Sequence, residues 1–275
     1  MIRELRYVNS RGDEIAFGGD SGPWHFGQLD IFDTGQAYRS TGGRVTSFGP
    51  EIRELSLAVF MREGSLGERN RFADVLDYDV RTGQAGTLWA GGSWMRCWIP
   101  NRKVSEWEHY DSMAVYECTV LTDRPVWVRQ EEIVLAAVEP TDDAGLNYPH
   151  DYPHNYAYSA GASARVRNPF MLPCKCDIAF PGPCRDPYVI IGANRYQVKT
   201  EVQAGQLLIV RGFGDRGIVL RHSDGTERSA FAAGVREPGA NVFAEVPVGS
   251  LTAAWSGSYN VSVTLYDERP TPWLE

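Results

Sequence analysis

Alternating hydrophobic and polar positions predict β-strands in the first half of the chain. Residues 55–61 place leucine, valine and methionine at every second position, with alanine and phenylalanine among the residues between, so this strand is expected to be buried on both faces. Residues 87–90 and 93–99 are rich in tryptophan and are separated by Gly91-Gly92, a sequence typical of a hairpin turn. A further strand is expected at about residues 114–121.

One short amphipathic helix is expected at about residues 66–78. Ser65 and Glu68 have the spacing of a capping box, in which the serine caps the helix and the glutamate reaches back. Apolar residues, among them Phe72 and Leu76, then follow at helical spacing. The first 130 residues or so are therefore predicted to be mainly β with a single short α-helix.

A segment rich in proline and tyrosine interrupts this pattern near the middle of the chain. It repeats a four-residue unit, whose tyrosines and prolines are Tyr148, Pro149, Tyr152 and Pro153. Each proline restricts its own φ, lacks a backbone N–H and disfavours a helical conformation of the tyrosine before it. Residues 131–160 are therefore expected to form an extended connector between two domains.

After residue 161 the pattern is again that of short strands separated by turns, which is typical of a β-sandwich. Residues 174–180 and 258–265 alternate regularly, and no convincing helix follows the connector. The expected organisation is an N-terminal domain at 1–130, a connector at 131–160 and a C-terminal β-sandwich at 161–275.

Composition and charge exclude several functional classes. The net charge is −8 and no run of Lys or Arg occurs, which argues against specific nucleic-acid binding. Residues 1–7 carry charges where a signal peptide needs an apolar core, and no apolar run is long enough to span a membrane. The five scattered cysteines suggest reduced thiols in a protein made in a cytoplasm.

The sequence predicts no metal site, although two groups of residues contain potential ligands. His150 and His154 stand four residues apart, but the prolines between them prevent the helix that would bring both imidazoles to one face. Cys174 and Cys176 share one face of a predicted strand, with Cys184 nearby. Buried thiols that pack as small hydrophobic groups are the favoured interpretation, and a three-cysteine metal site is the alternative.

Signatures of cofactor binding and catalysis are weak. Residues 212–217 match G-x-G-x-x-G, but strand and turn residues follow where a dinucleotide site needs a helix, so a glycine-rich hairpin loop is expected. Motifs of nucleophilic hydrolases and zinc proteases are missing. Carboxylate pairs such as Asp142 with Asp143, or Asp77 with Asp79, lack any indication of the separation that glycosidases need. We therefore expect no enzymatic activity and no cofactor.

Aromatic residues in the second half of the chain are candidates for contact with a glycan or a partner protein. The two candidates are Trp255 and Trp273, the second of which lies in a proline-flanked C-terminal segment. Packing in the core is the alternative for both. It is favoured for Tyr259, which stands on an alternating strand.

The order of these segments resembles the distal tail protein (Dit) family of long-tailed, non-contractile bacteriophages. The opening Tyr7-Val8-Asn9-Ser10-Arg11-Gly12 is similar to a tyr-x-asn-ser-x-gly start common in that family. The other segments that carry the resemblance are 51–57 with the helix after it, the Tyr-Pro repeat, 168–169, 203–207 and 255–266. The match extends over nearly the whole chain, although residues 171–187 and the histidines of the repeat depart from the family pattern.

The resemblance implies a structural baseplate protein at the virion tail tip, assembled in the host cytoplasm. It implies a homo-hexameric ring in which the first domain contacts the tail tube protein and the tail-associated hub protein. The second domain would be a galectin-like sandwich, similar to carbohydrate-binding modules, that carries a receptor-binding protein. A carbohydrate-binding protein that recognises host cell-wall glycans is the alternative, and a hydrolase with unplaced carboxylates is a third possibility.

Overall fold

The protein folds as two compact units. The computed structural model describes residues 5–18, 22–30, 37–49, 51–62, 66–108, 113–138 and 161–273. The first unit comprises Met1–Arg129 and Glu268–Glu275, and the second comprises Gln130–Asp267. The chain therefore passes between the units twice, once at residues 129–130 and once at residues 267–268.

This division differs from the expected one at both of its boundaries. The first boundary lies inside a strand at residues 129–130, before the Tyr-Pro repeat, and residues 130–138 belong to the second unit. The C-terminal segment from residue 268 belongs to the first unit, although it was expected in the sandwich. The repeat itself, with Tyr148, Pro149, Tyr152 and Pro153, lies outside the described residues.

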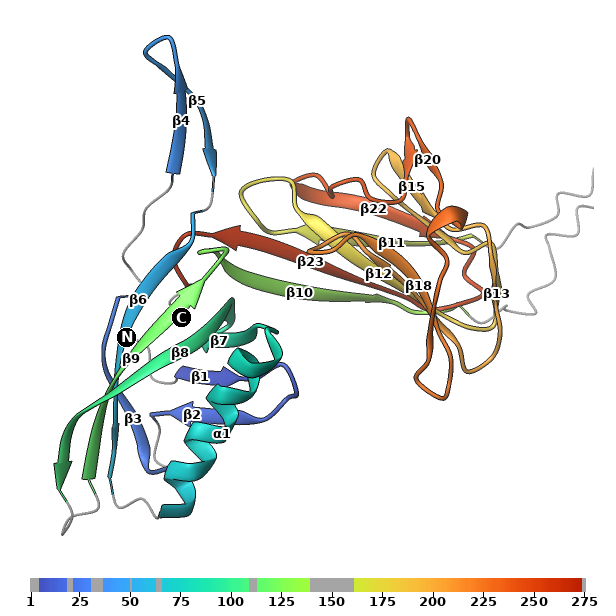
Figure 1. Cartoon of the computed structure of the whole chain (residues 1–275). Helices are drawn as coiled ribbons and strands as arrows, with labels where there is room; N and C mark the ends of the chain where they lie inside the picture. Colours follow the sequence, from blue (N-terminus) through green and yellow to red (C-terminus); the bar gives the residue numbers. More distant parts are fainter. Residues whose placement is uncertain are drawn as a thin grey trace, which may run out of the picture. The chain divides into compact units, whose positions relative to one another are not determined.

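In its described residues, the first unit consists of antiparallel strands with one helix (Figure 1). Its elements are β1 (Leu5–Val8), β2 (Glu14–Phe17), β3 (Trp24–Leu29), β4 (Ala37–Thr41), β5 (Arg44–Gly49), β6 (Arg53–Met61), α1 (Leu66–Thr82), β7 (Gly86–Ala90), β8 (Ser93–Glu108), β9 (Met113–Thr122) and the beginning of β10 (Trp127–Leu135). The strand expected at 114–121 is confirmed as β9. The hairpin expected around Gly91-Gly92 is confirmed as β7 and β8, with Ala90 opposite Ser93.

The long strand β8 joins two sheets of this unit. Its first part pairs with β7, which pairs with β1, and β1 pairs with β2. Its second part pairs with β9, which pairs with β6, and β6 pairs with β3. The register between β8 and β9 shifts between Trp98 and Asn101, and such irregularities let a strand bend from one sheet into the next.

Strand β6 has only one buried face, so the expectation of burial on both faces is wrong. Its alternating residues Leu55, Leu57, Val59 and Met61 are at most 5 % exposed. On the other face Ser56 is exposed and the intervening positions are at most half-buried. A single hydrophobic core therefore lies on one side of β6.

The predicted helix is confirmed as α1 and extends to Thr82, four residues beyond the expected end. It ends before Gly83, which has a φ of 68° that glycine adopts without strain. The helix buries Phe72 and Leu76 in the core of the unit. Glu68 lies in its first turn, while Ser65, the other half of the expected capping box, is outside the described residues.

A buried carboxylate attaches α1 to the first strand. Asp79 is 0 % exposed and accepts hydrogen bonds from the Tyr7 hydroxyl at 2.5 Å and from the Ser10 hydroxyl at 2.6 Å. The backbone N–H of Ser10 donates a third bond at 2.8 Å. The side chain of Asn9 donates to the backbone carbonyl of Val75 at 3.3 Å, one helical turn earlier. These residues of the tyr-x-asn-ser-x-gly segment therefore set the position of the helix.

The second unit consists of strands and one short 3₁₀ turn, η1 (Phe231–Ala233), within its described residues. Its strands are the remainder of β10, β11 (Ala162–Asn168), β12 (Lys175–Pro181), β13 (Cys184–Arg185), β14 (Tyr188–Ile191), β15 (Asn194–Gln197), β16 (Glu201–Val202), β17 (Leu207–Arg211), β18 (Gly217–Arg221), β19 (Glu227–Ser229), β20 (Arg236–Glu237), β21 (Ala240–Asn241), β22 (Gly249–Trp255) and β23 (Val261–Arg269).

Two antiparallel sheets enclose the core of this unit, as expected for a sandwich. One sheet has the order β19-β18-β17-β12-β23-β10, and the other has the order β11-β22-β14-β15. The alternation in β12 is confirmed, because Cys176, Ile178 and Phe180 are at most 4 % exposed while the residues between them are half-buried. Side chains from both sheets form one continuous hydrophobic cluster.

Two local expectations for the second unit concern a glycine-rich loop and the final strand. The G-x-G-x-x-G segment is confirmed as a hairpin loop, since Arg211 pairs with Gly217 across it. Asp177 holds this loop by accepting bonds from the N–H groups of Gly212 and Phe213 at 2.9 and 3.0 Å. The final strand begins at Val261 rather than 258, because the chain bends at residues 257–259, where Gly257 has a φ of 81°.

The sequence patterns did not predict strand β10. Its sequence has Arg-Gln-Glu-Glu at 129–132, and this charged stretch interrupts the apolar pattern between Trp127-Val128 and Ile133-Val134-Leu135. Its apolar residues lie at its two ends, so the sequence of β10 lacks the regular alternation that identifies a half-buried strand.

Candidate assembly surfaces

Strands β4 and β5 form a two-stranded ribbon, residues 37–49, whose side chains are almost all exposed. The strands pair with each other and with no other described strand. Gly42 and Gly43 connect them with φ angles of 60° and 75°, as a two-residue hairpin turn requires. An isolated two-stranded hairpin is marginally stable in water. The ribbon therefore needs a surface to pack against.

A β-bulge gathers the large apolar side chains of the ribbon on one face. Tyr38 lies opposite Phe48, and Ser40 lies opposite Val45, because the register shifts between Arg39 and Ser40. The shift lets Val45 and Phe48 share a face although they are three residues apart. Tyr38, Val45 and Phe48 are 65 %, 52 % and 67 % exposed, so this apolar face is open to solvent.

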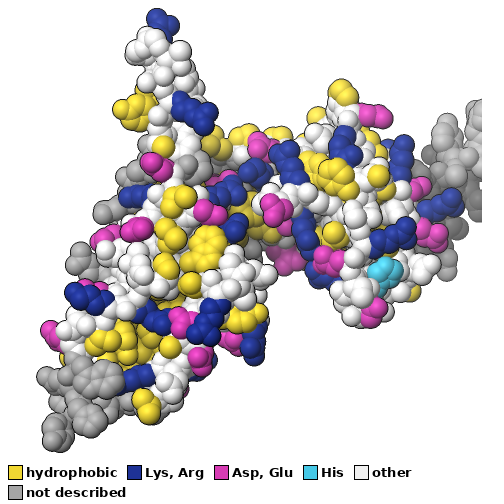
Figure 2. All heavy atoms as spheres, in the orientation of Figure 1, with side chains coloured by type: hydrophobic (Ala, Val, Ile, Leu, Met, Phe, Trp, Pro, Cys, Tyr) yellow, Lys and Arg dark blue, Asp and Glu magenta, His cyan; other side chains and the backbone are white. Residues whose placement is uncertain are grey.

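The opposite face of the ribbon is basic. Arg39 and Arg44 lie on this face, and residues 37–49 contain no Asp or Glu. Hydrophobic and basic side chains lie together along the ribbon, at the upper left of Figure 2. Since the whole chain carries a net charge of −8, the rest of the chain carries −10.

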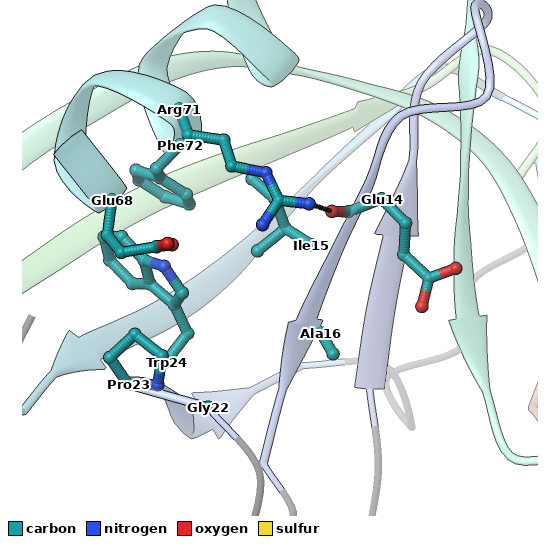
Figure 3. Close-up of a pocket in the computed structure, with 9 residues that line it drawn as sticks. All are labelled: Glu14, Ile15, Ala16, Gly22, Pro23, Trp24, Glu68, Arg71 and Phe72. Carbon is teal, nitrogen blue, oxygen red and sulfur yellow. Dashed lines mark hydrogen bonds between the residues drawn. The ribbon is translucent and has the colours of Figure 1, made fainter.

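A pocket of about 350 Å³ lies between the N-terminal half of α1 and strands β2 and β3 (Figure 3). Nine residues line this α1 pocket: Glu14, Ile15, Ala16, Gly22, Pro23, Trp24, Glu68, Arg71 and Phe72. Its floor is aromatic, because the ring of Trp24 stacks on that of Phe72 with centroids 4.3 Å apart. Both rings are buried and cannot move away without disturbing the core.

Charged side chains form the rim of the α1 pocket. The guanidinium of Arg71 donates to the backbone carbonyl of Glu14 at 3.0 Å and so connects the helix to β2. The carboxylate of Glu14 pairs with Arg6 at 3.4 Å and remains 42 % exposed. Leu66, in the first turn of the helix with Glu68, is 71 % exposed. An apolar floor whose rim carries two carboxylates and one guanidinium suits an apolar side chain accompanied by positive charge.

The Trp-rich hairpin contributes an aromatic surface covered by arginines. Trp89 and Trp94 lie on the outer face of β7 and β8 with ring centroids 6.3 Å apart, and both are half-buried. The guanidinium of Arg6 lies 4.6 Å from the ring centre of Trp89, and that of Arg96 lies 5.5 Å from Trp98. The arginines therefore cover much of this aromatic surface.

The two tryptophans predicted to contact a glycan or partner lie in different units. Trp255 is 3 % exposed, and its indole N–H donates to the carbonyl of Tyr259 at 3.1 Å, so its ring belongs to the core of the second unit. Trp273 belongs to the first unit, where its backbone N–H donates to Ser93 and the guanidiniums of Arg129 and Arg269 lie over its ring. The burial of Trp255 argues against a role in surface contact.

The cysteines behave as buried hydrophobic residues. Cys97, Cys118, Cys174 and Cys176 are buried free thiols, and Cys184 is half-buried. Burial raises the pKa of Cys118 and of Cys174 to about 12 and that of Cys184 to about 11. Within the described ranges, no group of three or more potential ligands is arranged to hold a metal ion. His150 and His154 lie outside those ranges.

The carboxylate pairs considered for catalysis have structural partners where they are described. Asp79 is the buried acceptor beneath α1, and Asp77 pairs with Arg102 at 2.7 Å. Asp142 and Asp143 lie outside the described residues. Among the helices that the structure describes, none is long and apolar enough to cross a membrane.

The sequence patterns predicted neither the ribbon nor the α1 pocket. The Gly42-Gly43 pair between alternating residues is a hairpin signal that could have identified the ribbon. The pocket has no comparable signal, because its lining comes from β2, the start of β3 and α1, and these segments meet only in the folded unit.

The fold is similar to that of solved phage tail components. One chain of the phage P2 baseplate, in its activated conformation with Ca, aligns with a TM-score of 0.60 and 12 % identity over 99 % of this chain and 100 % of its own length. The P2 baseplate with Sr gives the same values. The SPP1 Dit protein, a paradigm of the hub adsorption apparatus in phages that infect Gram-positive bacteria, aligns with a TM-score of 0.54 and 8 % identity over 97 % and 98 %.

Comparison by sequence adds no relative, because neither a family model nor a curated protein matches the chain. The similarity is therefore one of fold, and it includes both units rather than a single shared domain. The chain has the fold of phage baseplate and Dit proteins along nearly its whole length, as the sequence resemblance predicted.

Proposed function

We propose that this protein is a structural component of a phage tail tip and has no enzymatic role. The observation that carries the proposal is the alignment of both units, in one chain, with baseplate and Dit proteins from end to end. A sandwich alone would be weak support, since sandwiches serve many functions. The same two units, in the same order and in chains of matching length, are more specific evidence than a sandwich alone.

The first unit forms a homo-hexameric ring in this proposal. A ring requires heterologous contacts, in which one surface of a copy binds a different surface of the next. The ribbon and the α1 pocket are two such different surfaces, one convex and apolar and the other concave. The ring would join the tail tube protein to the tail-associated hub protein.

The second unit serves as the arm of the ring in this proposal. It would carry a receptor-binding protein at the virion tail tip, after assembly in the host cytoplasm. Its two-sheet architecture is compatible with the galectin-like sandwich that the sequence resemblance implies. Glycan binding receives no support from Trp255, because that ring is buried in the core.

Electron microscopy of the purified protein tests this proposal. We expect ring-shaped particles with sixfold symmetry in negative stain, and a hexamer mass by light scattering. Mixing with the tail tube and hub proteins of the same phage should give complexes with the ring. A protein that stays monomeric at high concentration, alone and with both of those proteins present, would contradict it.

A further inference from the structure

We propose that the apolar face of the ribbon in one copy docks into the α1 pocket of a neighbouring copy. The inference rests on the proposed function, because it specifies the contact by which the first unit would assemble. It concerns Tyr38, Val45 and Phe48 on the ribbon, and the pocket between α1, β2 and β3 on the neighbour.

The ribbon pairs with no other strand among the described residues of its own chain. Its three large apolar side chains are between 52 % and 67 % exposed, although the bulge places them together on one face. Scattered exposed apolar residues are ordinary, whereas a gathered set on a protruding element is typical of an interaction site. Aromatic residues are also enriched where interfaces gain most of their binding energy.

Two hollows lie in the described part of the first unit, and the α1 pocket fits the ribbon better. Its floor is formed by apolar side chains, including Ile15, Trp24 and Phe72. Its volume of about 350 Å³ is near the lower end of cavities that hold small ligands, which suits one aromatic ring. The other hollow, of about 620 Å³, is lined mainly by polar and charged residues: Arg11, Asp13, Gly67, Asn70, Arg71, Asp74, Val75, Asp77, Tyr78, Arg81 and Thr82.

The distribution of charge favours a ribbon from a second copy of the chain as the occupant of the α1 pocket. The ribbon carries Arg39 and Arg44 without a compensating acid, while the rest of the chain carries −10. Two carboxylates, Glu14 and Glu68, and one guanidinium, Arg71, line the pocket. The arginines lie on the face opposite Tyr38, so they would contact the rim and guide the approach rather than enter the pocket.

The contact is heterologous, which leads to a distinctive experiment with two variants. Tyr38→Ser combined with Phe48→Ser removes the ribbon contact, and Ala16→Arg obstructs the pocket. Tyr38, Phe48 and Ala16 are exposed, so both variants should fold, which circular dichroism would check. Each variant alone is expected to self-associate about 30-fold more weakly than the unchanged protein. Met171→Glu, at an 81 % exposed apolar position in the second unit, is the matched control and should assemble normally.

An equimolar mixture of the two variants should form a heterodimer that grows no further. The ribbon variant keeps an intact pocket, and the Ala16→Arg variant keeps an intact ribbon. One contact can therefore form between them, and the resulting dimer has no intact surface left for another copy. Analytical ultracentrifugation distinguishes this dimer from a closed ring. Ser40→Cys and Ala16→Cys, introduced in separate copies, should also yield a disulfide-linked dimer only when mixed, since the native cysteines are buried or half-buried.

Two outcomes would overturn the inference, and they separate it from the proposed function. If the unchanged protein forms rings and both variants still form them with equal strength, the docking contact is wrong and the tail-tip proposal remains. If the mixed variants form no dimer and the cysteine pair forms no crosslink, the docking contact is also wrong. A monomeric unchanged protein, alone and with its tail partners, would contradict both proposals.

Discussion

The hydroxyl of Tyr7 donates a hydrogen bond to Oδ2 of Asp79 over 2.5 Å and so connects the first strand to the last turns of a helix 72 residues later. The two bonds from Ser10 complete the set of donors around this fully buried carboxylate. The position of α1, and with it the α1 pocket, depends on this contact.

Replacing the buried carboxylate should destabilise the first unit. Asp79→Asn removes the charge and turns part of the acceptor into a donor that faces the hydroxyls of Tyr7 and Ser10. We expect a loss of about 2–3 kcal/mol in the free energy of unfolding. Urea unfolding followed by tryptophan fluorescence measures it, since seven of the eight tryptophans lie in the first unit. Asp74→Asn, on the exposed side of the same helix, should change stability by less than about 0.5 kcal/mol.

Adding a single methyl group at Gly86 should disturb the same contact. A Cβ at this position would overlap with both the Asp79 carboxylate and the Tyr7 hydroxyl, neither of which can move into solvent. Gly86→Ala is therefore expected to lower the unfolding midpoint in urea by an amount similar to that of Asp79→Asn. Gly49→Ala is the control, because its Cβ would meet no atom within 4 Å. An unchanged midpoint for Gly86→Ala would show that the pair is not tightly packed.

Residue Asn168 should be important for the stability of the second unit. Its side chain, 1 % exposed, accepts from the N–H of Phe170 and donates to the carbonyls of Leu172 and Val246. Asn168→Ala leaves these backbone groups without their partner and should cost about 2 kcal/mol. Hydrogen exchange of β12 and β22 measures the effect. Ser163→Ala, on the exposed face of β11, should leave exchange unchanged.

The buried thiols predict a loss of stability in alkali. Burial raises the pKa of Cys118 and Cys174 from an ordinary 9.0 to about 12, so the folded state holds these protons more tightly than the unfolded state does. Their contribution to stability is complete below about pH 9 and disappears as the pH rises towards 12. Urea midpoints between pH 8 and 11 should fall, and Cys118→Ala with Cys174→Ala should flatten that slope. An equal slope in the variant would assign the loss to other groups.

The ribbon should contribute to assembly without contributing to folding. Replacing residues 38–48 with a glycine-serine loop removes Tyr38, Val45 and Phe48, none of which is buried in the first unit. We expect the free energy of unfolding of the monomer to change by less than about 0.5 kcal/mol while self-association is lost. Urea unfolding at low protein concentration and light scattering at high concentration measure the two properties. A large loss of monomer stability would mean that the ribbon packs on its own chain.

Regular alternation and helical spacing were sufficient to predict several elements of this protein. The helix at α1, the β7–β8 hairpin and the strands β9 and β12 all carry a pattern that repeats within a few residues. The charged stretch at 129–132 broke such a pattern, which is why β10 was missed.

The sequence alone determined which residues alternate, where one helix forms and which overall fold to expect, because these features depend on neighbours along the chain. The tertiary structure decided that β6 has one buried face, that Trp255 lies in a core and that Trp273 belongs to the first unit. It also decided that Asp79 meets Tyr7 and Ser10, and that α1, β2 and β3 enclose a pocket. Burial and contact depend on segments that are distant in sequence, and only folding brings these segments together.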